Sequence, residues 1–325
     1  MNMKKIIFGF TIFLSTSIFS QDDLENFLNN VVVDGYLNDS EIILEGFMSP
    51  LGASLGSGLN AGWFNTAKTH GLGRFDVTAG IHFIGFPDDS KSFNPSNDLS
   101  VFQINGDPNI PTFIGGESES EISYGLSQTF DAPRGTELPV LPVPYFQGSI
   151  GLIKKTELMF RASPIKTDFG KLELGYWGLG LKHDIMQWIP IAKKIPIDLS
   201  VLAAYSNLSS TFNFYEDQSM DLNVKAFTSS ILLSKKLSFI TLYTALGYNY
   251  SSSSLQLNGS FTNNQGELFS EGSDPIIDIN FGELNGFKGN LGIRMKLLIF
   301  TIHAQYTKAE YDIFSIGLGL NADWK

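Results

Sequence analysis

Apolar and polar residues alternate along most of this chain. At the C-terminal end, apolar residues occupy every second position from Phe314 to Trp324, and small or polar residues occupy the positions between them. The same alternation runs through Phe300–Tyr306, Leu291–Leu297 and Phe75–Phe83. A period of two residues indicates a strand with two unlike faces. Each run is about 10 residues long, which is the length that a tilted strand needs to cross the hydrocarbon layer of a membrane.

The polar face of these strands is unusual for a water-soluble β-protein. It is made mainly of Gly, Ser, Asn and scattered charges of both signs, which suits a confined, hydrated lumen better than a face open to bulk water. We therefore predict an all-β transmembrane antiparallel barrel; a soluble secreted β-protein is the alternative. Aromatic residues gather at the predicted strand ends, where outer-membrane barrels carry girdles of such rings: Trp63, Phe64, Phe83, Phe86, Tyr248, Tyr250, Tyr306, Tyr311 and Trp324.

The pattern predicts about 12 to 14 strands. Twelve are placed at 51–66, 71–85, 120–130, 143–153, 156–165, 170–184, 195–207, 220–235, 237–251, 286–298, 299–309 and 312–325. An even number places both chain ends in the periplasm.

The connections between the predicted strands differ in length. Tight turns are expected on the periplasmic side at Ile153–Thr156, Lys235–Lys236 and Leu298–Ile299, and extracellular loops at Asn207–Asp221 and Asn263–Asn285. The segment 86–119 would be a long periplasmic loop in this count, and a hairpin hidden in it would raise the number to fourteen. Apolar residues change phase near Phe227, which indicates a bulge.

The N-terminal region differs from the rest. Residues 1–20 combine Lys4 and Lys5 with a short apolar run and are predicted to be a secretory signal peptide. No later run is long enough and apolar enough to predict a transmembrane helix. Residues 21–50 are expected to form a short helical segment, either a plug in the lumen or a periplasmic helix, and 51–325 the barrel.

Two helical stretches are expected in that segment. The first is marked by a stripe of four residues with helical spacing, Leu24, Phe27, Leu28 and Val31. The second is Glu41–Met48, with Asp39 and Ser40 as caps.

Composition narrows the possible partners. Removing Lys4 and Lys5 with the signal peptide changes the formal net charge from −11 to −13, so nucleic acid is not an expected partner. The chain has no cysteine and so no disulfide or thiolate metal site.

Three segments carry a resemblance to a known family: Gly58–Ala67, Thr156–Arg161 and Gly178–Pro190. They resemble an uncharacterised outer-membrane family in which a domain of unknown function covers nearly the whole mature chain. In layout alone, an N-terminal segment followed by a barrel is remotely similar to the long-chain fatty-acid transporter (FadL) family. That likeness implies about fourteen strands, an N-terminal hatch and passage of hydrophobic molecules, and none of its ligand-binding residues maps onto this sequence. The last residues, Trp324-Lys325, depart from the usual aromatic C-terminus.

Charged residues on the inward face are the candidate functional residues. Candidate residues for binding a solute in the lumen are Arg161, Arg294, Lys182 and Arg74. Arg161 or Arg294 could bind the carboxylate of an amphipathic solute through two parallel hydrogen bonds. The alternative is that these cations pair with acidic neighbours such as Asp76 and Glu157 as structural lumen pairs.

Other chemistry is not predicted. The four histidines have no metal-ligand spacing, no cofactor motif occurs, and the glycines of Gly52–Gly58 fit no phosphate loop and are interpreted as strand glycines that permit close packing. Ser315 and His303 lie on neighbouring predicted strands but lack an orienting group, so no catalytic residue is assigned and a hydrolase is only a third alternative.

The expected function is that of a barrel in the outer membrane of a Gram-negative bacterium that passes small or hydrophobic solutes. A closed structural or surface-interaction barrel without transport is the main alternative. The expected partners are outer-membrane lipid and lipopolysaccharide, the barrel-assembly machinery, and a small hydrophobic solute as cargo.

Overall fold

The structure is a computed structural model that describes residues 27–28, 30–32, 36–125, 128–162, 167–168, 172–189, 196–215, 218–259, 261–262, 268–269 and 275–322. The predicted signal peptide and Trp324-Lys325 lie outside these residues.

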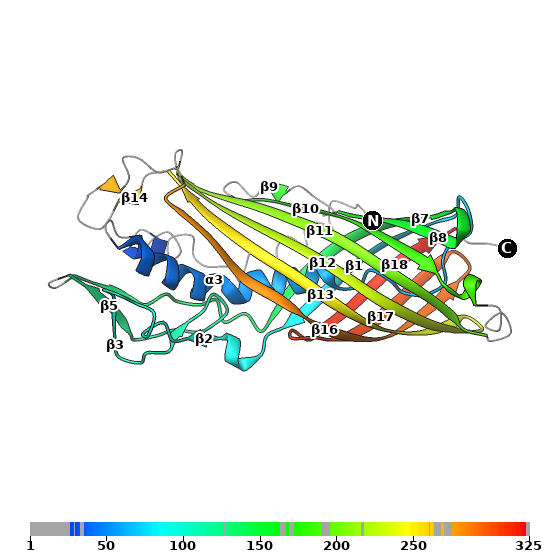
Figure 1. The fold of residues 1–325 in the computed structure, drawn as a ribbon, viewed down its shortest axis with the longest axis horizontal. Coiled ribbons are helices and arrows are strands. Elements are labelled where there is room, and N and C mark those ends of the chain that lie inside the picture. Colours follow the sequence, from blue (N-terminus) through cyan, green and yellow to red (C-terminus); the bar gives the residue numbers. More distant parts are fainter. Residues whose placement is uncertain are drawn as a thin grey trace, which may run out of the picture.

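Ten antiparallel strands in the described part of the chain form a closed barrel (Figure 1). Each strand pairs with the next along the chain, and the ring closes where the first strand pairs with the last, from Asp76↔Asn321 to Ile84↔Ile313. The ten strands are β1 (Phe75–Gly85), β7 (Val140–Leu152), β8 (Thr156–Ala162), β10 (Leu172–Asp184), β11 (Asp198–Tyr215), β12 (Gln218–Leu237), β13 (Ile240–Asn258), β16 (Ile277–Leu297), β17 (Phe300–Lys308) and β18 (Ile313–Asn321).

Two of the twelve predicted strands are not in this ring. Residues 51–60 belong to a helix, α3 (Leu37–Asn60), so the predicted strand 51–66 is wrong. The predicted strand 120–130 forms a hairpin that lies outside the barrel. The other ten predicted strands correspond to the ten observed, so the expected 12 to 14 strands are corrected to ten.

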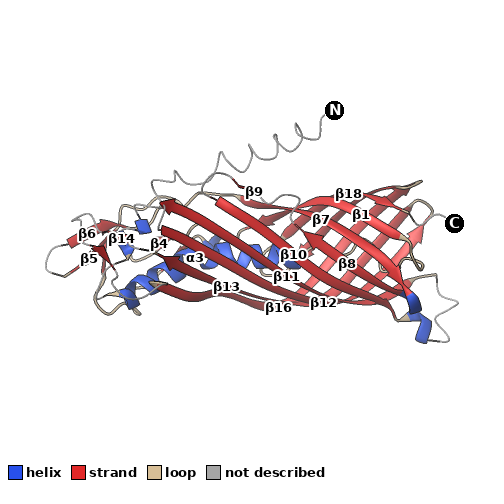
Figure 2. Ribbon diagram, turned by 90° about the horizontal axis from the view of Figure 1, so that it is seen from above, coloured by secondary structure: helices blue, strands red, loops and turns tan. Residues whose placement is uncertain are grey.

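Residues 86–139, apart from 126 and 127, form an outer lobe that connects β1 to β7 at the end of the barrel opposite the tight turns (Figures 1 and 2). The expected periplasmic loop at 86–119 is therefore at the other end, because loss of the strand at 51–66 reverses the direction of the chain there. The lobe holds one short helical turn, η1 (Asp88–Ser90), and small strands that pair among themselves: β2 (Ser92–Phe93), β3 (Gln103–Asn105), β4 (Ile110–Pro111), β5 (Glu121–Tyr124) and β6 (Gln128–Asp131).

The predicted tight turns at Ile153–Thr156 and Leu298–Ile299 are confirmed, whereas Lys235 and Lys236 belong to β12 and the turn follows at 238–239. These turns lie at η2 (Ile153–Lys155), between Leu237 and Ile240, and between Leu297 and Phe300, all at one end of the barrel, which also carries η3 (Met186–Trp188). The remaining short strands are β9 (Thr167–Asp168), paired with β10, and the pair β14 (Phe261–Thr262) and β15 (Leu268–Phe269).

Four neighbouring strands are longer than the other six, which have 7 to 13 residues. β11, β12, β13 and β16 have 18, 20, 19 and 21 residues, whereas β17 and β18 have 9 each. Beyond the ring the long strands continue as a curved wall (Figure 1). Much of the predicted loops Asn207–Asp221 and Asn263–Asn285 is therefore strand.

The wall explains the change of phase near Phe227. β12 pairs with β13 without interruption through this position, so the predicted bulge is wrong. Between Phe227 and the tight turn, Ile231 and Leu233 point outward and are exposed. On the other side of Phe227, Met220, Leu222 and Val224 point inward and are buried. The backbone alternation is unchanged; what changes is which face of the strand meets an apolar environment.

An apolar belt surrounds the ring. Every one of the ten strands carries at least one large outward-facing apolar side chain that is exposed, such as Phe287 (86%) and Leu246 (73%). In the wall, on the side of the belt away from the tight turns, the outward residues are polar, for example Gln256 on β13 and Asp278 on β16. The ring is thus apolar outside and mainly polar inside, whereas the wall is mainly polar outside and apolar inside.

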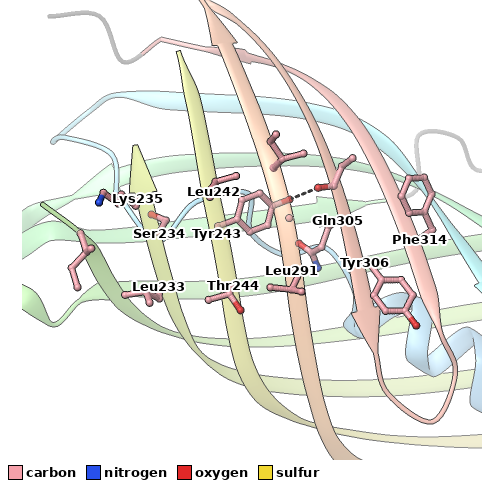
Figure 3. Close-up of a pocket in the computed structure, with 14 residues that line it drawn as sticks. Leu233, Ser234, Lys235, Leu242, Tyr243, Thr244, Leu291, Gln305, Tyr306 and Phe314 are labelled. Atoms are coloured by element: carbon pink, nitrogen blue, oxygen red, sulfur yellow. Dashed lines mark hydrogen bonds between the residues drawn. The ribbon is translucent and has the colours of Figure 1, made fainter. Parts of the chain in front are cut away.

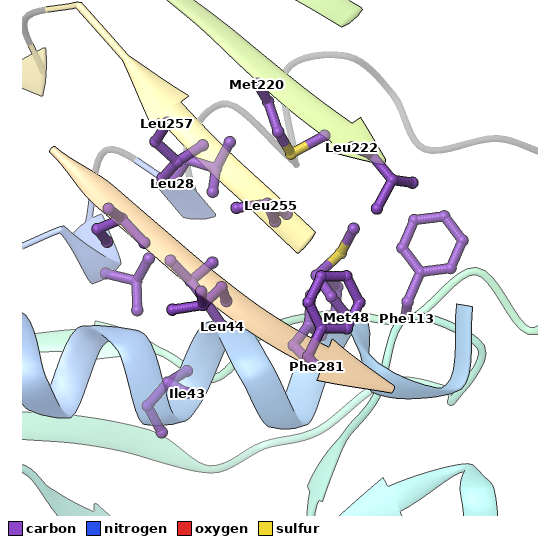
Figure 4. Packing of buried hydrophobic residues seen from close by; sticks show 14 of the residues in the cluster. Leu28, Ile43, Leu44, Met48, Phe113, Met220, Leu222, Leu255, Leu257 and Phe281 are labelled. Carbon is purple, nitrogen blue, oxygen red and sulfur yellow. The ribbon is translucent and has the colours of Figure 1, made fainter. Parts of the chain in front are cut away.

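Helix α3 lies along the inside of the wall and enters the ring (Figure 2). By length and composition it could span a membrane, but most of its apolar stretch is buried within the protein. Its first half packs against the wall in a cluster that includes Ile43, Leu44, Phe47, Leu255 and Leu257 (Figure 4). The predicted helical residues Phe27, Leu28 and Val31 are buried in the same cluster; Leu24 lies outside the described residues.

The second half of α3 is slender because its glycines face the strands. A Cβ atom on Gly52 would lie 2.6 Å from Ser253 Oγ, and one on Gly56 would lie 2.3 Å from Ser251 Oγ. The predicted role of these glycines in close packing fits these distances, but they lie in a helix and not in a strand. Glycine has a low helix propensity, so packing inside the barrel must stabilise this half of the helix.

Asp39 and Ser40 do not cap the helix, which begins after Tyr36 without a side-chain cap. Asp39 instead accepts hydrogen bonds from three backbone N–H groups of the outer lobe, those of Ser100 (3.0 Å), Val101 (2.7 Å) and Phe102 (2.7 Å). Burial alone would raise the pKa of the Asp39 carboxyl group, but the bonds from Phe102, Ser100 and Val101 outweigh it and lower the pKa below the usual 3.8.

We expect acid to loosen the outer lobe from α3. Because the folded-state pKa of Asp39 is depressed, its contribution to stability is complete above pH 3.8 and is lost as the pH falls through the lower, folded-state value. Below the folded-state pKa of Asp39, hydrogen exchange of the Ser100–Phe102 amides should accelerate by more than the pH dependence of exchange in an unstructured chain accounts for. In Asp39→Asn these amides should exchange fast at neutral pH as well, and unchanged protection in that variant would contradict the assignment.

Candidate functional site in the barrel lumen

The chain crosses the barrel lumen between α3 and β1. We call residues Asn60–His70 the luminal segment. It is buried along most of its length, with Trp63 1%, Phe64 3% and Ala67 0% exposed. These three side chains pack against inward residues of the ring, including Met159 and Leu202. Trp63 and Phe64 were expected at a strand end in the aromatic girdle, so that expectation is wrong.

Arg161 of β8 makes several hydrogen bonds and ring contacts around the luminal segment. It is 1% exposed. Its Nη1 donates to the Ala61 carbonyl (2.7 Å), while Nε and Nη2 both donate to Gln147 Oε1 (3.1 and 2.7 Å). The guanidinium also lies over the rings of Trp63 (4.2 Å) and Tyr145 (4.7 Å). Such geometry uses the planar fork and the stacking ability of arginine together.

Lys182 and Glu157 form a buried ion pair that lies nearer to the tight turns than Arg161 does. Lys182 Nζ lies 3.0 Å from Glu157 Oε2, and both side chains are 2% exposed. Lys182 also donates to the Thr66 carbonyl (3.4 Å), and Glu157 accepts the backbone N–H of His70 (3.1 Å). The pair therefore neutralises itself and holds both sides of one stretch of backbone.

Lys288 of β16 binds the end of the luminal segment that joins α3. Its Nζ donates to the Asn60 carbonyl (3.0 Å) and to Thr228 Oγ1 (2.6 Å), and the residue is 4% exposed. Lys288 was not among the predicted residues, although it shares the inward phase of Asn290 and Arg294 and could have been found from the same alternation.

Polar wall residues hold further backbone groups of the segment. Gln147 donates to the Trp63 carbonyl (3.2 Å), Ser200 donates to the Ala67 carbonyl (2.5 Å), and Ser234 accepts the Ala67 N–H (3.0 Å). Buried carbonyl and N–H groups need such partners because an unpaired one costs about 1–3 kcal/mol. The ring thus supplies the hydrogen bonds that a segment without regular secondary structure cannot make for itself.

The opposite side of the lumen carries a second polar group. Arg294 Nη2 lies 3.6 Å from Asp76 Oδ2, both nearly buried. His303 Nε2 lies 3.1 Å from the Tyr145 hydroxyl, and His82 Nδ1 lies 2.8 Å from Ser315 Oγ. Among the described residues, buried oxygen atoms without a hydrogen-bond partner also occur here, in Asn290, Thr301 and Gln305.

The family model of this chain covers almost its entire length. It matches residues 3–322, and its description is a family of unknown function, DUF6588. The chain belongs to the DUF6588 family. This agrees with the resemblance to a family of unknown function seen in the sequence.

Other comparisons add little to what this DUF6588 chain shows by itself. Curated proteins offer no match. Solved structures with some likeness include Ail, the attachment invasion locus protein of Yersinia pestis (10% identity, 77% of this chain and 98% of that one, TM-score 0.27). Others are the translocator domain of the autotransporter NalP from Neisseria meningitidis (11%, 82% and 91%, 0.32) and the toluene transporter TbuX from Ralstonia pickettii (8%, 78% and 90%, 0.20). The closed ring is defined by the strand pairings of this chain.

The predicted site residues of the DUF6588 chain have different environments. Arg161, Lys182 and Arg294 are inside the ring, whereas Arg74 precedes β1 and is exposed at the end with the tight turns, so its placement in the lumen is wrong. Glu157 pairs with Lys182 rather than with Arg161. Arg161 contacts the protein's own backbone where a solute carboxylate was considered.

No described group of three His, Asp or Glu side chains could hold a metal ion. Ser315 and His303 are not hydrogen-bonded to each other: Ser315 bonds to His82 and His303 bonds to Tyr145. The remote likeness to the FadL family stays a prediction, and the fourteen strands it implied are not observed.

A pocket of about 670 Å³ lies among β12, β13, β16, β17 and β18 (Figure 3). Tyr243 crosses the space over Gly292, where a Cβ atom would lie 2.1 Å from its ring, and donates to the Ala304 carbonyl (3.3 Å). Many of the lining side chains belong to the apolar belt, such as Leu242 and Leu291. Inward residues such as Gln305 line it as well, so the pocket lies in the barrel wall at the level of the belt.

Proposed function

We propose that this DUF6588 protein is an outer-membrane barrel that is closed at rest by its own luminal segment and that presents its wall and outer lobe at the cell surface. The observation that carries this proposal is the burial of Trp63, Phe64 and Ala67 inside a ring that also hydrogen-bonds the backbone around them. A segment held in this way leaves the lumen of a ten-stranded ring filled.

The membrane location is supported by the apolar belt. Exposed apolar side chains on all ten strands would be costly in water but are favourable against lipid. β17 and β18, with 9 residues each, match the length needed to cross the hydrocarbon layer. In this proposal the partners are outer-membrane lipid, lipopolysaccharide and the assembly machinery, and no catalytic role is assigned.

Passage of a small or hydrophobic solute is the second candidate. It is favoured by the unpaired buried oxygen atoms of Asn290, Thr301 and Gln305, since buried polar groups without protein partners commonly bind water. A hydrated strip beside the luminal segment could widen into a path if the segment moved. The closed barrel remains the first choice because the segment is packed by apolar side chains as well as by hydrogen bonds.

Conductance in planar bilayers tests the proposal. We expect the purified wild-type barrel to produce no sustained current, and the double variant Arg161→Met/Lys288→Met to produce discrete openings because two of the contacts to the segment are gone. Stable current steps from the wild-type protein would overturn the closed state. A mature protein that stays dissolved as a compact particle without detergent would overturn the membrane location.

A further inference from the structure

The direction in which the chain crosses the lumen determines where its two ends lie. Contacts of α3 and the luminal segment progress steadily along the barrel. Gly52 faces Ser253 and Gly56 faces Ser251 near the wall, Asn60 meets Lys288 inside the ring, and Ala67 meets Ser234 close to a tight turn.

The segment leaves the lumen at the end that carries the tight turns. Beyond His70, the Gly73 N–H donates to the Gly151 carbonyl (2.9 Å), next to η2, and Arg74 leads directly into β1. The last strand finishes at the same end, because Ala322 N–H donates to the Phe75 carbonyl (2.9 Å) and Asn321 N–H donates to the Ile299 carbonyl (2.7 Å).

The chain therefore crosses the barrel an odd number of times in its described part. Ten strands return it to the end at which β1 begins, and the luminal crossing before β1 adds one more passage. The N-terminal end of α3 and the C-terminal end of β18 consequently lie at opposite ends. Both chain ends were expected in the periplasm from an even number of strands, and that expectation did not include a luminal crossing.

We infer that the barrel carries its own N-terminal segment across the outer membrane, so that the start of α3 and the described residues before it (27–28, 30–32 and 36) are on the cell surface while β18 ends in the periplasm. The inference rests on the proposed outer-membrane location. In bacterial outer-membrane barrels the short turns face the periplasm and the long connections face outward. The wide end, with the outer lobe and the start of α3, is then outside.

Two features of the structure suit such a crossing. The part of α3 that enters the ring is built from small residues, and a Cβ on Gly52, Gly56 or Gly58 would come within 2.7 Å of a barrel side chain. The chain ahead of it continues on the outside: Phe27, Leu28, Val31 and Val32 are buried against wall residues such as Leu255 and Leu257, above the apolar belt. This packing holds the N-terminal segment at the outer end once it has arrived.

Single cysteines and a membrane-impermeant maleimide test the inference on intact cells, because the natural chain contains no cysteine. The probes are three exposed positions: Asn38→Cys at the start of α3, Glu119→Cys in the outer lobe, and Lys154→Cys in a tight turn. We expect Asn38→Cys and Glu119→Cys to react equally before and after the outer membrane is permeabilised. Lys154→Cys should react only after permeabilisation.

The outcomes separate this inference from the proposed function. Labelling of Glu119→Cys on intact cells without labelling of Asn38→Cys would overturn the inference and leave the outer-membrane barrel standing. Reaction of Lys154→Cys alone on intact cells would mean the reverse orientation and would also overturn it. A protein absent from the outer-membrane fraction would overturn the proposed function itself. Glu45→Cys, also exposed on α3, provides a second probe should Asn38→Cys fail to fold.

Discussion

Lys182→Met is expected to lower the free energy of unfolding by about 3–5 kcal/mol. The substitution leaves the Glu157 carboxylate inside the ring without the ammonium group that lies 3.0 Å away. It also removes a hydrogen bond to the Thr66 carbonyl. Urea titration of the barrel refolded in lipid vesicles, followed by tryptophan fluorescence, measures the change.

Two further variants identify the cause of that loss. The double variant Lys182→Met/Glu157→Gln should recover part of the stability, because removing both charges avoids an uncompensated one. Lys155→Met is the matched control: its ion pair with Asp184 is also 3.0 Å long, but the lysine is 57% exposed, and such pairs contribute about 0–1 kcal/mol. If the Lys182 and Lys155 variants lost equal stability, the buried pair would have no special role.

Arg161→Met is expected to destabilise the barrel by about 3 kcal/mol and to loosen the luminal segment. The guanidinium donates three hydrogen bonds, and its loss leaves the buried Ala61 carbonyl and Gln147 Oε1 without these donors. The contacts with the rings of Trp63 and Tyr145 disappear as well. We expect Trp63 emission to shift to longer wavelength and the Ala61–Ala67 amides to exchange faster, which fluorescence and hydrogen-exchange mass spectrometry can follow.

Two control variants accompany Arg161→Met: one keeps the charge at position 161, and the other removes an arginine at an exposed position. Arg161→Lys should restore only part of the stability, because an ammonium group lacks the planar fork and stacks less well. Arg74→Met should have little effect, since Arg74 is exposed outside the ring. A normally folded Arg161→Met barrel that keeps the segment protected but loses uptake of a carboxylated solute would instead support the solute-binding role considered from the sequence.

Much of the ring could be predicted from the sequence because the two faces of each strand are determined by residues that are close together in the chain. Each strand places apolar side chains on the outer face of the ring and small or polar ones in the lumen, so the two faces alternate at every second residue. β17 and β18 show it plainly, with Ile302, Tyr306, Phe314 and Leu318 exposed outward and Thr301 and Ser315 buried inward. The short turns follow from the same pattern.

Where the alternation misled, the environment of a segment had changed. Leu51, Ala53 and Leu55 alternate with small residues as a strand would, yet they lie in α3, whose glycines pack closely against inward side chains of the barrel. Residues 120–130 do form strands, but they pair within the outer lobe. In β12 the apolar residues before Phe227 face inward, because this part of the long strand lies beyond the belt and packs against α3.

The sequence by itself determined the strands of the ring, their inward and outward faces and the positions of most luminal charges, since these depend on residues close together in the chain. Only the tertiary structure decided what the charges hold. Arg161 and Ala61 are separated by 100 residues, and Lys288 and Asn60 by 228. A backbone carbonyl looks the same in every residue, so no side-chain pattern could reveal that these cations bind the chain's own backbone.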